Sequence, residues 1–139
     1  MKSLRVLLRQ RLEWIEDRLM KNADKNGYGY ISPSMARLYS YVEHKPTPMS
    51  ELARKLKISR QAVHQLVAEG IQSDFLEVID SESDKRVKMV QFSENGKKMA
   101  KIALAEIRQA EEDLKQHLGD KNVLELRRIL ELSWPDDQL

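Results

Sequence analysis

Two short helical patterns meet at a tight polar joint within residues 49–67, MSELARKLKISRQAVHQLV, and this stretch constrains the fold more than any other. Apolar residues at helical spacing mark the inner faces of the two predicted helices: Leu52, Ala53, Leu56, Val63, Leu66 and Val67. Ser50 and Ser59 stand where N-caps are expected, because a short hydroxyl side chain can accept from the free N–H groups of a first helical turn. The spacing predicts a helix-turn-helix.

The second of these helices would carry an unusual polar face. With Val63 and Leu66 buried, its polar side chains point outward together and can hydrogen-bond to base edges in the major groove of DNA. The residues expected to bind DNA from this helix are Ser59, Arg60, Gln61, His64 and Gln65. Ser50 and Lys57 are expected to contact phosphates, which positions a protein without reading sequence. The other interpretation of the polar face is a helix surface that only faces solvent.

After the helix-turn-helix the apolar period changes from helical to two, which is typical of β-strands. Residues 75–80 and 86–92 are predicted to form two paired strands, joined by a polar turn over residues 81–85. A hairpin directly after a helix-turn-helix is a wing. Lys85 and Arg86 lie at its tip, where they would reach a phosphate or the minor groove.

Four further helices are predicted around these motifs from apolar positions at spacings of three and four. The first covers residues 3–22, and the second begins after the N-cap Ser32. A long helix of roughly 25 residues follows the N-cap Ser93, and a last helix follows the N-cap Asp120. The first and last helices are apolar on more than one side, so each is expected to pack against a partner. The fold class is therefore mainly α with a small two-stranded β wing.

The formal net charge is only +2, but its distribution along the chain is uneven. Residues 45–65 carry five Lys/Arg and one acid, and residues 82–101 carry six Lys/Arg and three acids. Residues 102–139 carry five Lys/Arg and nine acids. A basic middle and an acidic end favour one face that meets phosphates and another with a different partner.

Composition excludes several kinds of chemistry. The chain has no cysteine, which removes disulfides, thiol redox sensing and cysteine nucleophiles. No nucleophile–base pair, glycine-rich phosphate loop or carboxylate pair stands out, so we expect neither an enzyme nor a cofactor. The first segment, MKSLRVLLRQRLEWIEDRL, has charges throughout and lacks the apolar run of a signal peptide or membrane span. We therefore expect a cytoplasmic protein with no membrane partner.

The order of elements and one motif resemble the MarR family of bacterial transcription regulators. Asp84-Lys85-Arg86, followed by Val90-Gln91-Phe92-Ser93-Glu94-Asn95-Gly96, looks like the D-x-R wing of that family running into its L-T-x-x-G helix start. The resemblance covers nearly the whole chain. It implies a winged helix-turn-helix homodimer whose Arg86 probes the minor groove. It also implies that the wing aspartate, Asp84, braces this arginine or the recognition helix.

The resemblance also implies how the domain is divided and used. The whole chain, residues 1–139, is expected to be one winged helix-turn-helix domain with a DNA-binding lobe over residues 32–93. Residues 1–30 and 94–139 would supply interleaved dimerisation helices. The expected function is sequence-specific binding of double-stranded DNA as a repressor on a pseudo-palindromic operator, with ligand release as a further expectation. The alternative is a protein-interaction module on the same fold that does not bind DNA.

The chain departs from the family pattern after Val67. Gly70 falls inside the presumed recognition helix, and Asp74 stands where glycine is usual. Asp tolerates a left-handed backbone better than most residues, so the turn can survive. The end of the recognition helix between Gly70 and Asp74 stays open at this stage.

Two weaker hypotheses concern small ligands. Because family members often sense aromatic anions near the dimer seam, a pocket for a small aromatic effector could be lined by tyrosines, with ordinary packing as the alternative: Tyr28, Tyr30, Tyr39 and Tyr41. His44 and the pair Asp113 and His117 are candidate metal ligands only if they converge in space. We expect no metal site.

Overall fold

The computed structural model of the chain describes residues 1–42 and 45–137. Within these residues the elements follow in this order: α1 (Leu4–Lys25), α2 (Pro33–Val42), β1 (Thr47–Pro48), α3 (Met49–Leu56), α4 (Arg60–Gln72), β2 (Leu76–Asp80), β3 (Lys88–Phe92), α5 (Glu94–Leu118) and α6 (Asp120–Glu131). The strands form one antiparallel sheet in the order β1-β3-β2. The predicted class, mainly α-helical with a small β wing, is confirmed.

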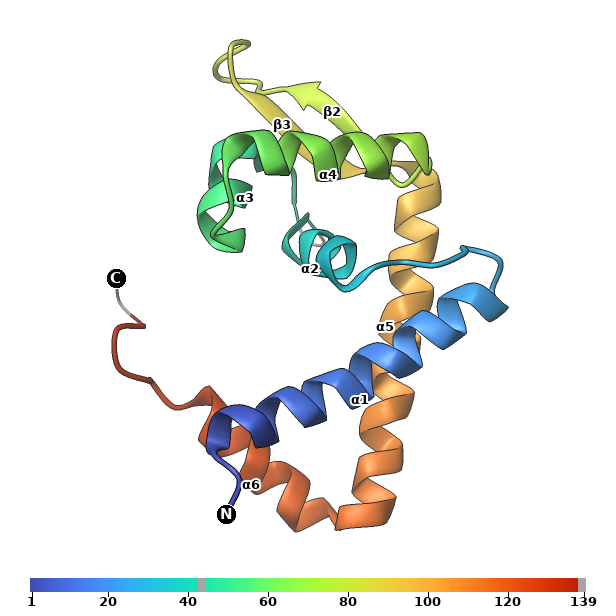
Figure 1. The fold of residues 1–139 in the computed structure, drawn as a ribbon. Helices are drawn as coiled ribbons and strands as arrows, with labels where there is room; N and C mark the ends of the chain where they lie inside the picture. Colours follow the sequence, from blue (N-terminus) through green and yellow to red (C-terminus); the bar gives the residue numbers. More distant parts are fainter. Residues whose placement is uncertain (43–44, 138–139) are drawn as a thin grey trace.

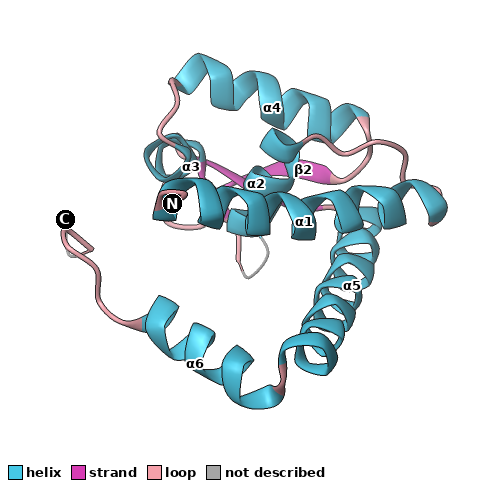
Figure 2. Ribbon diagram, turned by 60° about the horizontal axis from the view of Figure 1, so that its bottom comes forward, coloured by secondary structure: helices cyan, strands magenta, loops and turns pink. Residues whose placement is uncertain are grey.

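Helix α5 joins two parts of the molecule (Figure 1). One part holds α2, α3, α4 and the sheet, and the other holds α1, which crosses α5, and α6, which continues from its far end (Figure 2). The core lies in the first part, where the most deeply buried apolar side chains are Leu38, Leu52, Val63, Val67 and Val90. Helix α1 contributes no buried residue. The part with α2, α3, α4 and the sheet therefore has a buried core of its own, whereas the side chains of α1 are exposed or only half-buried in the single chain.

The sheet has three strands rather than the predicted two. Thr47 and Pro48 pair with Val90 and Met89 of β3, so β1 completes the sheet on the side opposite β2. Thr47 is only 1% exposed, and its hydroxyl donates to the carbonyl oxygen of Lys45 at 3.0 Å. The sequence did not indicate this strand, because two residues, one of them a proline, are too few to show a period of two.

Most of the predicted helix starts are confirmed by side-chain caps. The hydroxyls of Ser32, Ser59 and Ser93 accept from the backbone N–H three residues later, at 3.2, 3.1 and 3.0 Å. The prediction for Ser50 is wrong, because α3 begins at Met49 after the extended residue Pro48 and has no side-chain cap. Pairing of β1 with β3 fixes Pro48 in the extended conformation, so α3 starts at Met49, earlier in the chain than a cap at Ser50 would place it.

The prediction for Asp120 is also wrong. Gly119 occupies the N-cap position of α6 with a φ of 90°, and Asp120 is the first helical residue. The strand predicted from Arg86 begins instead at Lys88. The backbone turns back before it, since the N–H of Val87 donates to the carbonyl of Asp84 at 3.0 Å.

Helix α4 continues through Gly70 and ends at Gln72. A Cβ at Gly70 would lie 2.4 Å from Cδ1 of Leu76, so glycine permits close packing of α4 on β2. Asp74 then takes the left-handed conformation with a φ of 63°. The N–H of Phe75 donates to the carbonyl of Gly70 at 2.9 Å, which closes the helix end. The question that the sequence left open is thus answered.

Ser93 joins the end of α4 to the start of α5. Its hydroxyl donates to the carbonyl of Asp74 at 2.6 Å and accepts from the N–H of Gly96, and its own N–H donates to the carbonyl of Phe75 at 3.0 Å. Ser93→Ala removes both hydroxyl bonds, so we expect the free energy of unfolding to fall by about 1–2 kcal/mol. Urea denaturation measures this. Ser93→Thr keeps the hydroxyl and should retain most of the stability; an alanine variant as stable as the parent would contradict this role.

Candidate nucleic-acid interface

The polar face predicted for the second helix of the helix-turn-helix is present on α4. Val63 and Val67 are buried in the core, and the opposite side carries four exposed polar residues: Arg60, Gln61, His64 and Gln65. These positions lie within one side of a helix with 3.6 residues per turn. Ser59 is exposed immediately before them and caps the helix. Helix α4 therefore has an apolar inner face and a hydrogen-bonding outer face, as a helix entering a major groove requires.

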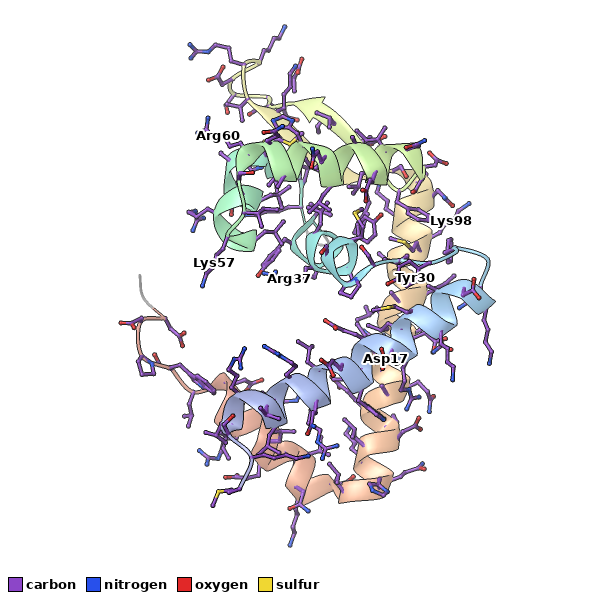
Figure 3. The ribbon with its side chains drawn as sticks, in the orientation of Figure 1. Asp17, Tyr30, Arg37, Lys57, Arg60 and Lys98 are labelled. Carbon is purple, nitrogen blue, oxygen red and sulfur yellow. The ribbon has the colours of Figure 1, made fainter. Side chains whose placement is uncertain are left out.

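The joint between α3 and α4 is a compact turn. Lys57 ends α3 with a left-handed φ of 56°, and the N–H of Ile58 donates to the carbonyl of Ala53 at 3.2 Å. Lys57 is exposed, and Figure 3 shows it pointing away from the wing, toward the side of the molecule where Arg37 lies. Ser50 is exposed in the first turn of α3. The side chain of Lys57 thus points away from the wing, which the sequence spacing did not indicate.

The wing holds Arg86 in a defined position. Its Nε and Nη2 donate to the two carboxylate oxygens of Asp84 at 3.1 and 3.2 Å, and its backbone N–H donates to Oδ1 at 3.0 Å. The Arg86 side chain is nevertheless 91% exposed. These bonds hold the pKa of Asp84 below its ordinary value, because they favour the carboxylate. The bracing contact implied by the family resemblance is therefore present.

One ion pair and one hydrogen bond join the side chains of the two long wing strands. Lys88 of β3 contacts Asp80 of β2, and the Gln91 amide donates to Glu77. Among the described residues Lys85 makes no ion pair. The wing therefore presents one held arginine and one free lysine at its tip. Sequence analysis missed the Lys88–Asp80 ion pair, although opposite charges at facing strand positions are a recognisable signal.

A largely apolar cavity of about 380 Å³ lies between α1, α2 and α5. Of the four tyrosines considered for an effector pocket, Tyr28 and Tyr39 line it. Burial raises the pKa of Tyr39 to about 12, so its phenol stays protonated at neutral pH. Tyr41 instead packs against the ammonium of Lys55, 5.6 Å from the ring centre. A cavity is therefore present beside two of the four tyrosines, Tyr28 and Tyr39.

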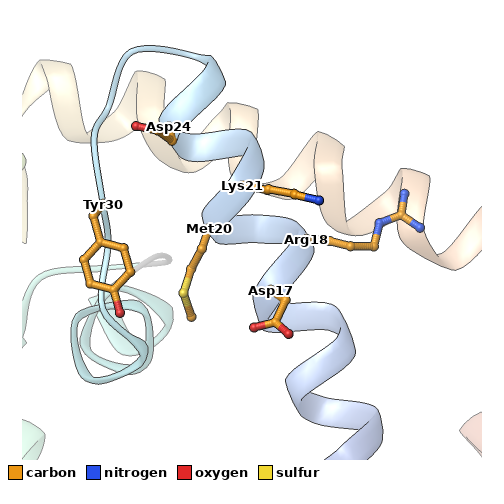
Figure 4. Close-up of a pocket in the computed structure, with 6 residues that line it drawn as sticks. All are labelled: Asp17, Arg18, Met20, Lys21, Asp24 and Tyr30. Atoms are coloured by element: carbon orange, nitrogen blue, oxygen red, sulfur yellow. The ribbon is translucent and has the colours of Figure 1, made fainter.

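Tyr30 lies at a second, open depression on α1 (Figure 4). This depression is lined by polar and charged residues together with one methionine: Asp17, Arg18, Met20, Lys21, Asp24 and Tyr30. In Figure 4, Met20 and Tyr30 lie on one side of α1, whereas Lys21 and Arg18 extend along the other. The charges of both signs and the open shape distinguish it from the apolar cavity.

Two polar contacts hold α1 against α5. Nη2 of Arg18 donates to Oδ2 of Asp113 at 2.6 Å, and Nδ2 of Asn22 donates to Oε2 of Glu106 at 2.6 Å. Arg18 and the amide of Gln109 lower the pKa of Asp113. Asp113, one of the candidate metal ligands, is therefore an ion-pair partner of α1.

Across residues 1–42 and 45–137 no group of three His, Cys, Asp or Glu side chains is arranged to hold a metal ion. His44, named as a candidate ligand, lies outside the described residues. In the same part of the chain no helix combines the length and apolar content needed to cross a membrane.

A helix-turn-helix followed by a hairpin and a long helix defines the winged helix-turn-helix class of proteins. The model of the MarR family matches residues 36–87, which cover the helix-turn-helix and most of the wing. Together with the fold of the whole chain, this match confirms the resemblance to the MarR family that the sequence indicated.

Solved structures show the same fold over almost the entire chain. Apo MarR from E. coli matches with a TM-score of 0.73 and 15% identity, covering 94% of this chain and 96% of that one. NadR in complex with 4-hydroxyphenylacetate matches with a TM-score of 0.71 and 15% identity, covering 94% and 91%. An S. aureus MepR–DNA complex matches with a TM-score of 0.71 and 13% identity, covering 94% and 95%. No curated protein matches the chain in sequence.

Proposed function

We propose that the chain is a homodimeric transcriptional regulator that binds double-stranded DNA sequence-specifically, represses from a pseudo-palindromic operator, and is released by a small molecule. The observation that carries the proposal is the exposed polar face of α4 beside a wing whose arginine is already oriented. Arg60 and Gln61 supply side chains suited to guanine and adenine edges. The MepR–DNA complex among the structural neighbours supports DNA as the partner.

The dimer is supported by apolar surface that the single chain leaves uncovered. On α1 the exposed large apolar residues are Leu4, Val6, Leu7, Leu8, Leu12 and Trp14. On α6 and the segment after it they are Leu124, Leu126, Ile129, Leu130, Leu132 and Trp134. Surface of this extent on two terminal helices marks an interaction site rather than ordinary exposure. A second copy of the chain offers the same helices and would bury both sets symmetrically.

The proposal is tested by measuring affinity for duplex DNA as a function of salt. A DNA-binding dimer should lose affinity steeply, with a log–log slope of about −0.9 per phosphate contacted. Duplexes selected from a random pool should contain two half-sites about 34–36 Å apart or at a multiple of one helical turn. Protection of a single asymmetric half-site would contradict the dimeric arrangement. A flat salt dependence on every duplex would instead favour the protein-interaction module.

The wing gives a separate prediction. Asp84→Asn removes one negative charge and the carboxylate oxygen that accepts from Nη2 of Arg86, so it loosens the hold on the Arg86 side chain. We expect tighter binding to all duplexes with a steeper salt slope, because a cation is freed for phosphates. We also expect a weaker preference for A·T-rich flanks, because an oriented arginine favours a narrow minor groove. Fluorescence anisotropy on duplexes with A·T-rich or G·C-rich flanks measures both effects.

Glu82→Gln is the matched control, since it removes a charge from the same turn without touching Arg86. It should steepen the salt slope while leaving the flank preference unchanged. If the Asp84 and Glu82 variants behave alike, the pairing with Arg86 has no role in sequence preference.

A further inference from the structure

Acidic residues outnumber basic ones in the described lining of the cavity between α1, α2 and α5. Most of its lining is apolar, and among the described residues that line it the charged ones are Glu16 of α1, Glu106 of α5 and Arg37 of α2. Glu16 and Glu106 are half-buried, whereas Arg37 is exposed. The described lining therefore carries two carboxylates against one guanidinium, and the guanidinium belongs to the most exposed of the three residues.

The carboxylates have unused hydrogen-bonding capacity. Oε2 of Glu106 accepts from Nδ2 of Asn22 at 2.6 Å, while Oε1 accepts no hydrogen bond from the described residues. Glu16 forms neither an ion pair nor a side-chain hydrogen bond with the described part of the chain. Carboxylates beside apolar surface gain most from a donor that carries positive charge.

We propose that the ligand of this cavity is an amphipathic cation, with an aromatic or apolar body and a protonated amine recognised by Glu16 and Glu106. This inference rests on the proposed function only in treating the cavity as the effector site. It departs from the family resemblance, which led us to expect an aromatic anion. An anion would approach two like charges where low polarity strengthens repulsion.

The rest of the cavity suits the body of such a ligand. Its volume of about 380 Å³ is in the range of small-molecule sites. Tyr28, Tyr39, Phe92 and Met99 provide aromatic and apolar surface. The faces of aromatic rings also attract a cation, so they favour the same sign of charge as the carboxylates.

Occupancy by an amine would have a mechanical consequence. Glu106 is also the residue through which α5 holds Asn22 of α1. An ammonium bound at Oε1 of Glu106 draws negative charge away from Oε2, the oxygen that accepts from the Asn22 amide, and so weakens one of the two polar contacts between α1 and α5. Ligand binding is thereby linked to the position of α1, the helix that the proposed dimer buries.

Three small phenols of similar size and different charge test the proposal: tyramine, neutral tyrosol and anionic 4-hydroxyphenylacetate. Calorimetric titration of the full-length protein without DNA should show tyramine binding about tenfold more tightly than tyrosol, with 4-hydroxyphenylacetate weakest. Glu106→Gln should lower tyramine affinity about tenfold while leaving tyrosol unchanged. The glutamine carbonyl can still accept from Asn22, so the fold should be retained; circular dichroism checks this.

Two further variants serve as comparisons. Glu16→Gln should also weaken tyramine selectively. Glu112→Gln makes the same charge change on α5 but pairs with Lys115 outside the cavity, so it should leave tyramine binding unchanged. The proposal is overturned if 4-hydroxyphenylacetate binds most tightly and Arg37→Gln abolishes that binding. Equal affinity for the three phenols, or binding of none at millimolar concentration, overturns it as well.

Operator binding is measured separately, by anisotropy in the absence of any phenol. A protein that binds DNA but does not prefer tyramine refutes this inference and leaves the proposed function standing. A protein that prefers tyramine but does not bind DNA refutes the regulator and leaves the ligand class standing.

Discussion

Leu8→Glu is expected to convert the proposed dimer into monomers and to lower operator affinity about 100-fold or more, because two linked half-site contacts become independent. Leu8 is 41% exposed on α1, within the apolar surface that we assign to the dimer. A buried carboxylate without a partner would carry a large desolvation cost in that interface. Analytical ultracentrifugation measures the oligomeric state, and fluorescence anisotropy measures the affinity.

Gln10→Glu is the matched control for Leu8→Glu. It adds the same charge two residues away, at about 200° around the helix, and it replaces an exposed polar residue. This variant should remain a dimer. If Leu8→Glu also remains a dimer with unchanged operator affinity, the second copy does not pack on this face of α1.

Arg60→Ala and Gln61→Ala should each weaken specific binding by roughly 1–3 kcal/mol per half-site and relax discrimination at one base pair. Both side chains are exposed at the first turn of α4, where recognition helices contact base edges. Because a dimer presents two copies, a palindromic operator should register the loss twice. Competition binding against operators changed at single positions measures the affinity and the lost discrimination together.

Arg54→Ala separates reading of bases from general attraction to DNA. Arg54 has a side chain that is 72% exposed on α3, the helix that precedes α4. Its removal should weaken binding to all sequences alike and reduce the salt slope. Uniform weakening by Arg60→Ala and Gln61→Ala as well would show that these residues contact only the DNA backbone.

Local patterns were sufficient to predict much of this fold. Three serine caps, the helix-turn-helix and the long helix after Ser93 each depend on residues within a few positions of one another. Ser50 failed as a cap because the conformation of Pro48 is set by pairing with Met89, a residue distant in sequence. Local signals therefore predicted the elements, and errors arose where a distant strand decided the outcome.

The same distinction applies to the candidate site: features within one segment could be predicted from the sequence, and features that join distant segments could not. The outward face of α4 follows from helical spacing alone, and the contact between Asp84 and Arg86 spans only two residues. The cavity, by contrast, is assembled from α1, α2 and α5, and the Asn22–Glu106 contact joins positions 84 residues apart. No pattern within a single segment indicates that Glu16 and Glu106 line one cavity. Its charge became apparent only in three dimensions.

One continuous helix, α5, runs from the end of the wing to the start of α6. Its 25 residues extend about 37 Å, so a tilt of about 5° at one end displaces the other by about 3 Å. That displacement is comparable to one base-pair step of duplex DNA. In the proposed dimer, a small molecule that alters the angle between α1 and α5 would therefore shift the two copies of α4 out of register with successive major grooves, without changing the fold around either copy.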